Sequence, residues 1–156
     1  MNAVFKKMQF KGHSPICVLE APESFLPNLE EMQEFTEVHT DLAPGQVYSY
    51  LVGFVKSVAE LEVMSGRVAN AVAEDQMFWI AYPKKSSKKY KTDISRDHGW
   101  ESIGELGYEP VRLIAIDADW SCMRLRKAEH IKSMTRRNSM ALSEKGKERT
   151  KGNSSK

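Results

Sequence analysis

Two apolar segments on either side of an amphipathic one constrain the fold of this chain more than any other feature. Residues 47–55 and 77–82 each have the length of a strand and consist almost entirely of aliphatic and aromatic residues. This composition is typical of strands that are buried on both faces of a sheet. Ser57, an N-cap residue with Glu60 three positions later, begins a helix between them. A strand, a helix and a second strand predict a parallel pair joined by a crossover.

Weaker signals extend this unit towards the N-terminus. Residues 15–21 form a compact apolar run that predicts a central strand, and the more polar residues 37–42 predict an edge strand. Between them Pro27 permits a helix only after it, and Asn28 and Glu31 have the spacing of a capping box. We therefore expect a short amphipathic helix between these two strands.

The second half of the chain predicts one more helix and a hairpin. Residues 93–107 have apolar residues at helical spacing, with Ser95 as a cap and Gly107 as a C-terminal stop. Residues 110–117 and 120–126 predict two strands. Because only two residues separate them, these strands can only form an antiparallel hairpin.

In chain order these elements read βαββαβαββ, which predicts an α/β fold with three layers. Short crossovers give a mostly parallel sheet of order about 2-1-3-4-6-5 that ends in the antiparallel hairpin. Residues 1–127 are assigned to a single α/β domain. Residues 128–156 contain few apolar residues, and we expect a basic tail that is partly helical or disordered.

Charge is distributed unevenly along the chain. Residues 126–156 hold ten Lys and Arg against three Asp and Glu, and residues 84–91 hold five lysines and no acid. The rest of the chain is acidic. The lysines of this loop and the tail could contact nucleic-acid phosphates, although a solvated loop and a disordered tail explain the same pattern. The candidate nucleic-acid residues are Lys84, Lys85, Lys88, Lys89 and Lys91.

Cysteine usage and hydropathy indicate a cytoplasmic protein. Cys17 and Cys122 lie inside apolar runs and predict buried, reduced thiols. No early segment resembles a secretory signal, and no apolar run approaches the roughly 20 residues that span a bilayer. The histidines are dispersed and lack a metal-ligand spacing, so no metal is expected.

Four motifs in order resemble those of a family of small bacterial proteins classed as a domain of unknown function. They are Ala21–Glu23 (APE), Trp79–Lys84 (WIAYPK), Thr92–Asp97 (TDISRD) and Ala115–Ser121 (AIDADWS). The resemblance covers roughly residues 5–126. It implies no established activity.

From residue 47 onward the predicted order is similar to the second half of class I S-adenosylmethionine-dependent methyltransferases. Those enzymes carry a glycine-rich turn after the first strand, where the backbone approaches the cofactor closely. Here that turn contains Glu20, Ala21 and Pro22, with no glycine. The resemblance therefore implies the fold and argues against the activity, and we expect no cofactor.

A rule for open parallel sheets locates the candidate binding site. Ligands bind beyond the carboxyl ends of the strands, where crossovers diverge to opposite faces. The rule selects residues 20–24, 56–57, 82–85 and 117–120, together with the loop 92–97. From these segments we choose as ligand-binding candidates Lys56, Ser57, Tyr82, Lys84, Ser95, Arg96 and Trp120.

The chemistry expected of these residues leaves alternatives open. Ser57 and Ser95 would each present a helix N-terminus to a phosphate or carboxylate, but each could simply cap its helix. Arg96 could bind an anion or pair with Asp93 or Asp97. Trp120 could be an exposed stacking surface or part of the core. No catalytic residue is identified.

Three functions are compatible with the sequence. The first is a non-catalytic domain that binds a small anionic ligand or a protein partner at the carboxyl edge of the sheet. The second is a nucleic-acid-associated protein that uses the loop 84–91 and the basic tail. The third is a degenerate methyltransferase-like enzyme. We expect no membrane partner.

Overall fold

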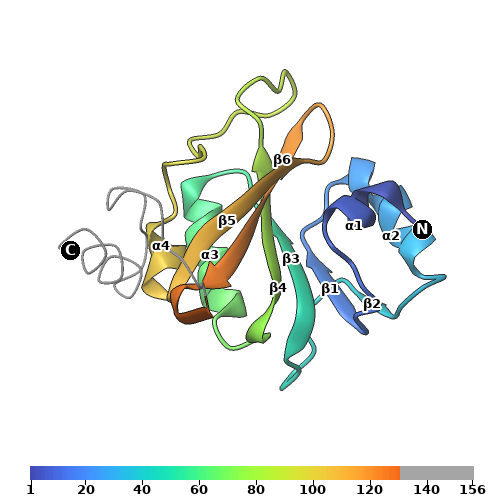
Figure 1. Cartoon of the computed structure of the whole chain (residues 1–156). Helices are drawn as coiled ribbons and strands as arrows, with labels where there is room; N and C mark the ends of the chain where they lie inside the picture. Colours follow the sequence, from blue (N-terminus) through green and yellow to red (C-terminus); the bar gives the residue numbers. More distant parts are fainter. Residues whose placement is uncertain (131–156) are drawn as a thin grey trace, which may run out of the picture.

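A six-stranded mixed sheet organises the computed structural model, which describes residues 1–130 (Figure 1). Its strand order is β2-β1-β3-β4-β6-β5, the order predicted from the sequence. The strands are β1 (Ile16–Leu19), β2 (Val38–His39), β3 (Tyr48–Phe54), β4 (Val72–Pro83), β5 (Tyr108–Ala115) and β6 (Trp120–Lys127).

Parallel pairing holds the first four strands together, and the last two are antiparallel. β1 pairs in parallel with β2 and β3, and β3 pairs in parallel with β4. β6 is antiparallel to both β4 and β5. The predicted α/β architecture with a C-terminal hairpin is confirmed.

Helices lie on both sides of the sheet. They are α1 (Ala3–Lys7), α2 (Leu26–Met32) after the 3-10 turn η1 (Glu23–Phe25), α3 (Val58–Val68) and α4 (Glu101–Glu105). Figure 1 shows α3 and α4 on one side and α1 and α2 on the other, beside β1. A second 3-10 turn, η2 (Ala128–His130), follows β6.

Two apolar clusters fill the space between these layers. On the side that we name the α3 face, Leu61 and Met64 of α3 pack against sheet residues such as Ile80. On the opposite side, the α1 face, Phe5 packs against sheet residues such as Trp79. Trp79 and Cys122 are fully buried, and Trp100 is 1% exposed, so these residues belong to the core as predicted.

The predicted third helix is mostly wrong. Of residues 93–107 only Glu101–Glu105 are helical, and Ser95 and His98 instead form an isolated β-bridge. Gly99 explains the failure, because its φ of 101° takes the chain out of helical geometry. The apolar residues of the segment are still core residues, since Ile94, Trp100 and Ile103 are buried, but a loop provides part of them.

Smaller differences concern the N-terminal half. α2 begins one residue before Pro27, and Asn28 lies inside the helix, where its side chain accepts a hydrogen bond from Asn2. The edge strand is reduced to Val38–His39. The sequence did not predict α1, a single short helix capped by the Asn2 side chain.

Two further predictions concern the ends of the described region. No helix within residues 1–130 is long and apolar enough to cross a membrane. The predicted basic tail lies outside the described residues from position 131 onward.

Candidate functional site

An open groove of about 410 Å³ lies at the carboxyl ends of β1 and β3. Its lining residues are Glu20, Phe54, Val55, Ala59, Glu60, Val63, Met64 and Arg67. The crossover after β1 packs its apolar side chains on the α1 face, whereas the crossover after β3 packs on the α3 face. The two crossovers therefore diverge at this point, which is where open α/β sheets bind ligands.

A glycine in β3 allows α3 to pack close to the sheet beside the groove. A Cβ added to Gly53 would lie 2.9 Å from Sδ of Met64 and 3.2 Å from Cδ1 of Ile80. A side chain at this position would require the side chains of Met64, which lines the groove, and Ile80 to shift. Gly53 thus leaves room for the Met64 side chain against β3.

The backbone at the end of β1 adopts an unusual conformation. Glu20 has a φ of 59°, in the left-handed region that non-glycine residues rarely occupy. Such positions cost stability and cluster at functional sites. The glycine-rich turn of methyltransferases is absent from the sequence, yet the chain turns here through a conformation that glycine favours.

The cation that lines the groove, Arg67, faces two carboxylates. Its Nη1 is 3.3 Å from Oε1 of Glu20, and its Nη2 is 3.4 Å from Oδ1 of Asp41. Both carboxylates are mostly exposed, and both distances are long for charge-assisted hydrogen bonds. The guanidinium is therefore held loosely, between the ends of β1 and β2, by groups that solvent also reaches.

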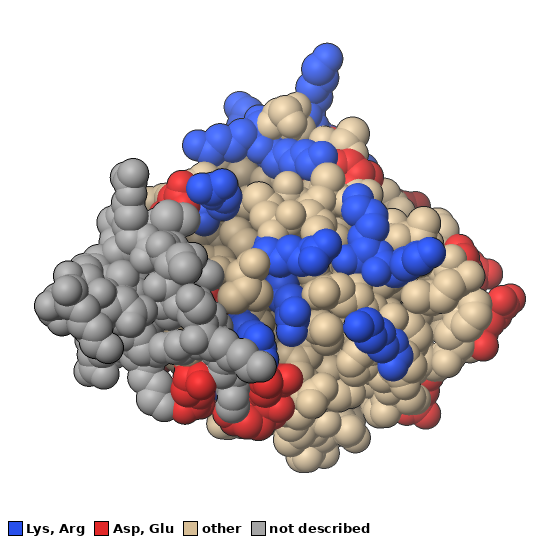
Figure 2. Space-filling model, viewed as in Figure 1, with Lys and Arg blue, Asp and Glu red and all other residues tan. Residues whose placement is uncertain are grey.

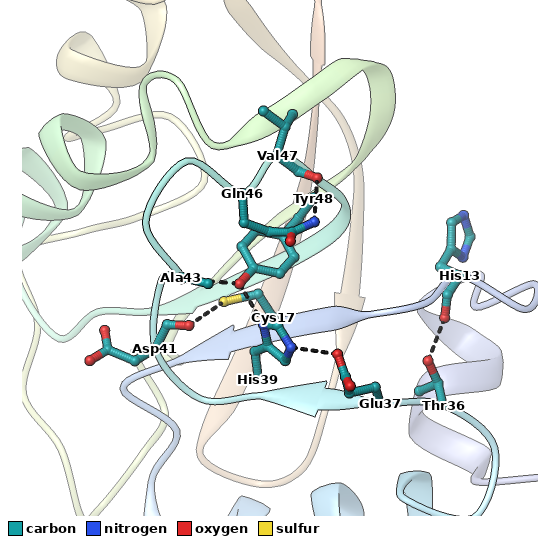
Figure 3. A network of polar contacts seen from close by, with 10 residues as sticks. All are labelled: His13, Cys17, Thr36, Glu37, His39, Asp41, Ala43, Gln46, Val47 and Tyr48. Atoms are coloured by element: carbon teal, nitrogen blue, oxygen red, sulfur yellow. Dashed lines mark hydrogen bonds and ion pairs between the residues drawn. The ribbon is translucent and has the colours of Figure 1, made fainter.

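A partly exposed polar network fixes the loop that carries Asp41 (Figure 3). The Tyr48 hydroxyl lies 2.6 Å from Nδ1 of His39 and accepts a hydrogen bond from the backbone N–H of Ala43 at 3.2 Å. Nε2 of His39 lies 2.7 Å from the Glu37 carboxylate. The network joins β2 to the start of β3 and so fixes the loop between them, whose Asp41 faces Arg67 of the groove.

Cys17 lies in the same region, and its thiol is unreactive. Its thiol lies 3.7 Å from the carbonyl oxygen of Asp41 (Figure 3). Burial raises the pKa of the Cys17 thiol to about 11 and raises the pKa of the Cys122 thiol well above its usual value. Neither thiol is ionised near neutral pH, which agrees with the structural role predicted from the sequence.

The N-terminus of α3 is occupied by the protein's own side chains. The Ser57 hydroxyl accepts from the Glu60 N–H at 3.1 Å, and Asp93 accepts from the Val58 N–H at 2.8 Å. Glu60 also accepts from the Lys56 N–H at 3.1 Å. Ser57 is a helix cap as predicted, but these contacts leave little room for the predicted anion cradle.

The predicted second anion cradle does not form, because Ser95 does not begin a helix. Its carbonyl oxygen accepts from the Trp100 indole N–H at 2.7 Å, and Arg96 pairs loosely with Asp97 at 3.6 Å. Arg96 is exposed and lies outside the groove lining. The ion-pair alternative for Arg96 therefore describes its contact.

Tyr82 and Trp120 are buried and cannot present a surface to a ligand. Tyr82 is 5% exposed and packs edge-to-face on Trp100 with ring centroids 5.4 Å apart. Burial raises the Tyr82 pKa to about 12. Trp120 is 1% exposed and packs against Phe54 at 5.2 Å and Tyr90 at 5.1 Å. The stacking role predicted for Trp120 is wrong, because the loop 84–91 folds over it.

The lysine loop, residues 84–91, is anchored to the hairpin turn. The Ser87 hydroxyl donates to the Asp119 carboxylate at 2.8 Å, and the Lys84 N–H donates to the Asp119 carbonyl at 2.8 Å. Tyr90 fixes the far end of the loop by packing on Trp120. The loop is therefore a folded surface, with its lysine side chains mostly exposed.

None of the seven predicted ligand-binding residues is among the lining residues of the groove. Lys56 and Ser57 lie next to the groove, but neither is among its lining residues, and the other five lie at the β4 and β6 end of the edge or in the loop 92–97. The sequence rule did select the turn at Glu20. Val63 and Met64 were missed because apolar residues of a helix are usually assigned to the core, and Arg67 because it belongs to no motif. Within residues 1–130 no group of three or more His, Cys, Asp and Glu could hold a metal ion.

Comparisons with known proteins return folds but no family. No protein-family model and no curated protein sequence matches the chain. Solved structures with a similar fold include the N-methyltransferase NodS from Bradyrhizobium japonicum WM9 in complex with S-adenosyl-L-homocysteine. The identity is 9%, over 71% of this chain and 65% of NodS, with a TM-score of 0.45.

Two other solved structures give a similar result. The pyocyanin biosynthetic protein PhzM is 12% identical over 80% of this chain and 54% of its own, with a TM-score of 0.48. A chain of the fibrillarin/Nop5p complex is 8% identical over 81% of this chain and 80% of its own, with a TM-score of 0.46. At these values the comparisons assign no activity to this chain.

Proposed function

We propose that this protein is a small-molecule-binding domain whose site is the groove between β1, β3 and α3. The observation that carries the proposal is the position of the groove, an apolar cavity at the point where the crossovers after β1 and β3 diverge to opposite faces. Its volume of about 410 Å³ lies within the range of small-molecule sites.

The lining residues favour a neutral or cationic ligand with an apolar ring or chain. Most of the lining surface is apolar, with Phe54, Met64 and Val63 among the side chains that form it. Glu20 and Glu60 offer carboxylate acceptors for hydroxyl or amino groups, while Arg67 is already placed between two carboxylates. We therefore propose a neutral or cationic ligand in place of the anionic ligand that the sequence predicted at the helix N-termini.

We propose binding without catalysis at this site. Each polar group of the lining already makes a contact within the protein: Glu20 with Arg67, and Glu60 with the Lys56 N–H. A carboxylate that serves as a base would instead need to point at the reacting atom of a bound substrate. The methyltransferase-like alternative stays open as an outcome of the test below.

The test is a thermal-shift screen of the full chain with adenosine, S-adenosylmethionine, its demethylated product, AMP and ATP. A ligand at 100 times its Kd stabilises the folded state by about 2.7 kcal/mol, enough to raise the melting temperature by several degrees. We expect the neutral or cationic probes to stabilise the protein and the phosphorylated ones to have little effect. Methyl transfer after binding of S-adenosylmethionine would favour the enzyme instead.

Two variants of α3 show whether the groove is the site. Val63 is 66% exposed and lines the groove, so Val63→Trp fills it from the rim without disturbing the core. Glu62→Trp adds the same bulk at the neighbouring exposed position, outside the lining. The proposal predicts at least a tenfold reduction of affinity in V63W and none in E62W. Unchanged binding in V63W, or no shift with any probe, would reject it.

A further inference from the structure

Three arginines lie side by side on the α1 face of the sheet. Arg124 of β6 lies directly opposite Trp79 of β4 and Arg112 of β5, so the three side chains share one face of the sheet. Arg126 follows Arg124 by two positions and therefore lies on the same side. We name Arg112, Arg124 and Arg126 the arginine face.

Described helices leave this part of the sheet largely open. Figure 1 shows α1 and α2 beside β1, while β5 and β6 cross the front of the molecule. Figure 2, from the same side, shows Lys and Arg gathered over this region and the lysine loop, with Asp and Glu mostly towards the margins. The acidic character of the rest of the chain is therefore not spread evenly over the surface.

Contacts within the protein satisfy this charge only in part. Asp75 pairs with Arg126 at 2.6 Å, and the Gln9 side chain accepts from Arg124 at 3.2 Å. No partner within residues 1–130 accepts from the buried Nε of Arg124. Burial, together with the nearby charge of Arg126 and of Arg112, lowers the Arg124 pKa. An external anion beside the exposed Arg112 would offset the repulsion among these guanidinium groups.

The basic surface continues from the arginine face to the lysine loop. Ile114 and Ile116 of the β5 side are half-buried against the same cluster. Beyond them lies the half-buried ring of Tyr90, with Nζ of Lys56 5.4 Å and Nζ of Lys89 5.5 Å from its centroid. At about 3.3 Å per residue, the stretch of β6 from Trp120 to Arg126 extends roughly 20 Å.

We infer that this surface binds single-stranded nucleic acid, with phosphates on the arginine face and bases on the strip formed by Ile114, Ile116 and Tyr90. The pattern of cations that follow one direction, beside apolar and aromatic side chains, is typical of surfaces that bind single strands without sequence preference. Arg124 and Arg126 are roughly 7 Å apart along their strand. This separation is close to the spacing of successive phosphates in an extended single strand. This site is separate from the groove and does not depend on it.

A narrow flank favours a single strand over a duplex. On one side the N-terminal segment reaches across the sheet, where Lys7 donates to the Ala115 carbonyl at 2.6 Å and Gln9 meets Arg124. On the other side the sheet ends at the edge strand β5. Between these limits, β6 and β5 carry the arginine face on two neighbouring strands about 4.8 Å apart.

The test measures binding of fluorescein-labelled 12-nucleotide poly-dT and poly-rU to the full chain by anisotropy at several salt concentrations. The key variant is Arg112→Glu, because Arg112 is exposed and its replacement leaves the core intact. The control is Arg96→Glu, the same charge change at an exposed position away from the arginine face. A third variant, Lys89→Glu, tests the lysine loop.

We expect salt-sensitive binding that R112E weakens at least tenfold and R96E hardly changes. The slope of log K against log salt should fall in R112E by about 0.7 for each phosphate that the variant no longer neutralises. K89E should also weaken binding, because Lys89 belongs to the same surface.

Four results would overturn the inference. Equal weakening in R112E and R96E would show that binding follows net charge, and weakening in K89E alone would restrict it to the lysine loop. Equally tight binding of poly-L-glutamate would show that the surface does not select nucleic acid, and equally tight binding of a DNA duplex would show that it does not select single strands.

Discussion

The two halves of the sheet's carboxyl edge differ in how completely their polar and aromatic side chains are occupied by contacts within the protein. At the β4 and β6 half, Trp120 and Tyr82 are buried, and Asp119 holds the lysine loop. At the β1 and β3 half, an open groove remains, with a left-handed residue at its rim and a loosely held arginine.

This difference teaches that charged and aromatic residues do not mark a site by themselves. The sequence is richest in them at the β4 and β6 half, where they pair with one another and cover the hairpin. The β1 and β3 half has fewer, but the divergence of two crossovers keeps it from being filled. Topology therefore locates the groove better than residue type does.

The largest expected effect concerns Trp120, at the β4 and β6 half of the edge. Trp120→Ala would leave a cavity between Phe54 and Tyr90 and should lower the free energy of unfolding by about 3–5 kcal/mol. Trp120→Phe keeps a ring and, since Nε1 has no partner within residues 1–130, removes no hydrogen bond, so its cost should be clearly smaller. Urea unfolding measures both. If W120A were as stable as the wild type, the packing of Trp120 at the β4 and β6 half would not contribute to stability.

A second prediction tests how closely α3 packs beside the groove. Gly53→Ala places a Cβ 2.9 Å from Sδ of Met64 and should cost about 1–3 kcal/mol in urea unfolding. Gly66→Ala is the control, because its Cβ would meet nothing within 4 Å on the exposed side of α3. That change should stabilise the protein by about 0.5–1 kcal/mol. Similar values for the two variants would argue against the packing at Gly53.

The third prediction concerns the N-terminus of α3, beside the groove. Asp93→Ala removes the acceptor of the Val58 N–H and should cost about 0.5–2 kcal/mol by thermal or urea unfolding. Asp93→Asn retains an acceptor oxygen and should cost less. If both variants were neutral, the capping contact from 35 residues away would not contribute to stability.

The smallest expected effect is at Arg96, which the sequence indicated as a ligand contact. The guanidinium is exposed and its pair with Asp97 is long, so Arg96→Ala should change the free energy of unfolding by less than about 0.5 kcal/mol. Binding to the groove should also be unaffected. A tenfold reduction of small-molecule affinity in R96A would instead restore the site predicted from sequence.

The architecture was predictable because its strands are strongly apolar. Residues 47–55 identify β3, and residues 77–82 identify the second half of β4. The short gap before Trp120, predicted as two residues and four in the structure, dictates the hairpin. Ser57 and Glu60 mark the start of α3 correctly. α1 was not predicted because it is held by one cap, from Asn2 to the Phe5 N–H, and by packing from distant residues.

The site was less predictable because it depends on contacts between distant residues. Asp93 caps a helix that begins at Val58, so the helix N-terminus that appears open in the sequence is occupied. The apolar periodicity of residues 93–107 predicted a helix, but Gly99 adopts a φ of 101° and interrupts it. Val63 and Arg67 face the groove only because β1 and β3 end beside α3.

The most direct test of the central claim is an NMR titration of the ¹⁵N-labelled full chain with adenosine, followed by amide chemical shifts. The proposed site predicts saturable shifts concentrated at Glu20, Val63 and Arg67, with little change at Ser95 and Arg96. Shifts centred on Ser95, Arg96 and Tyr82, or none at millimolar adenosine, would contradict the assignment of the binding site to the β1 and β3 half.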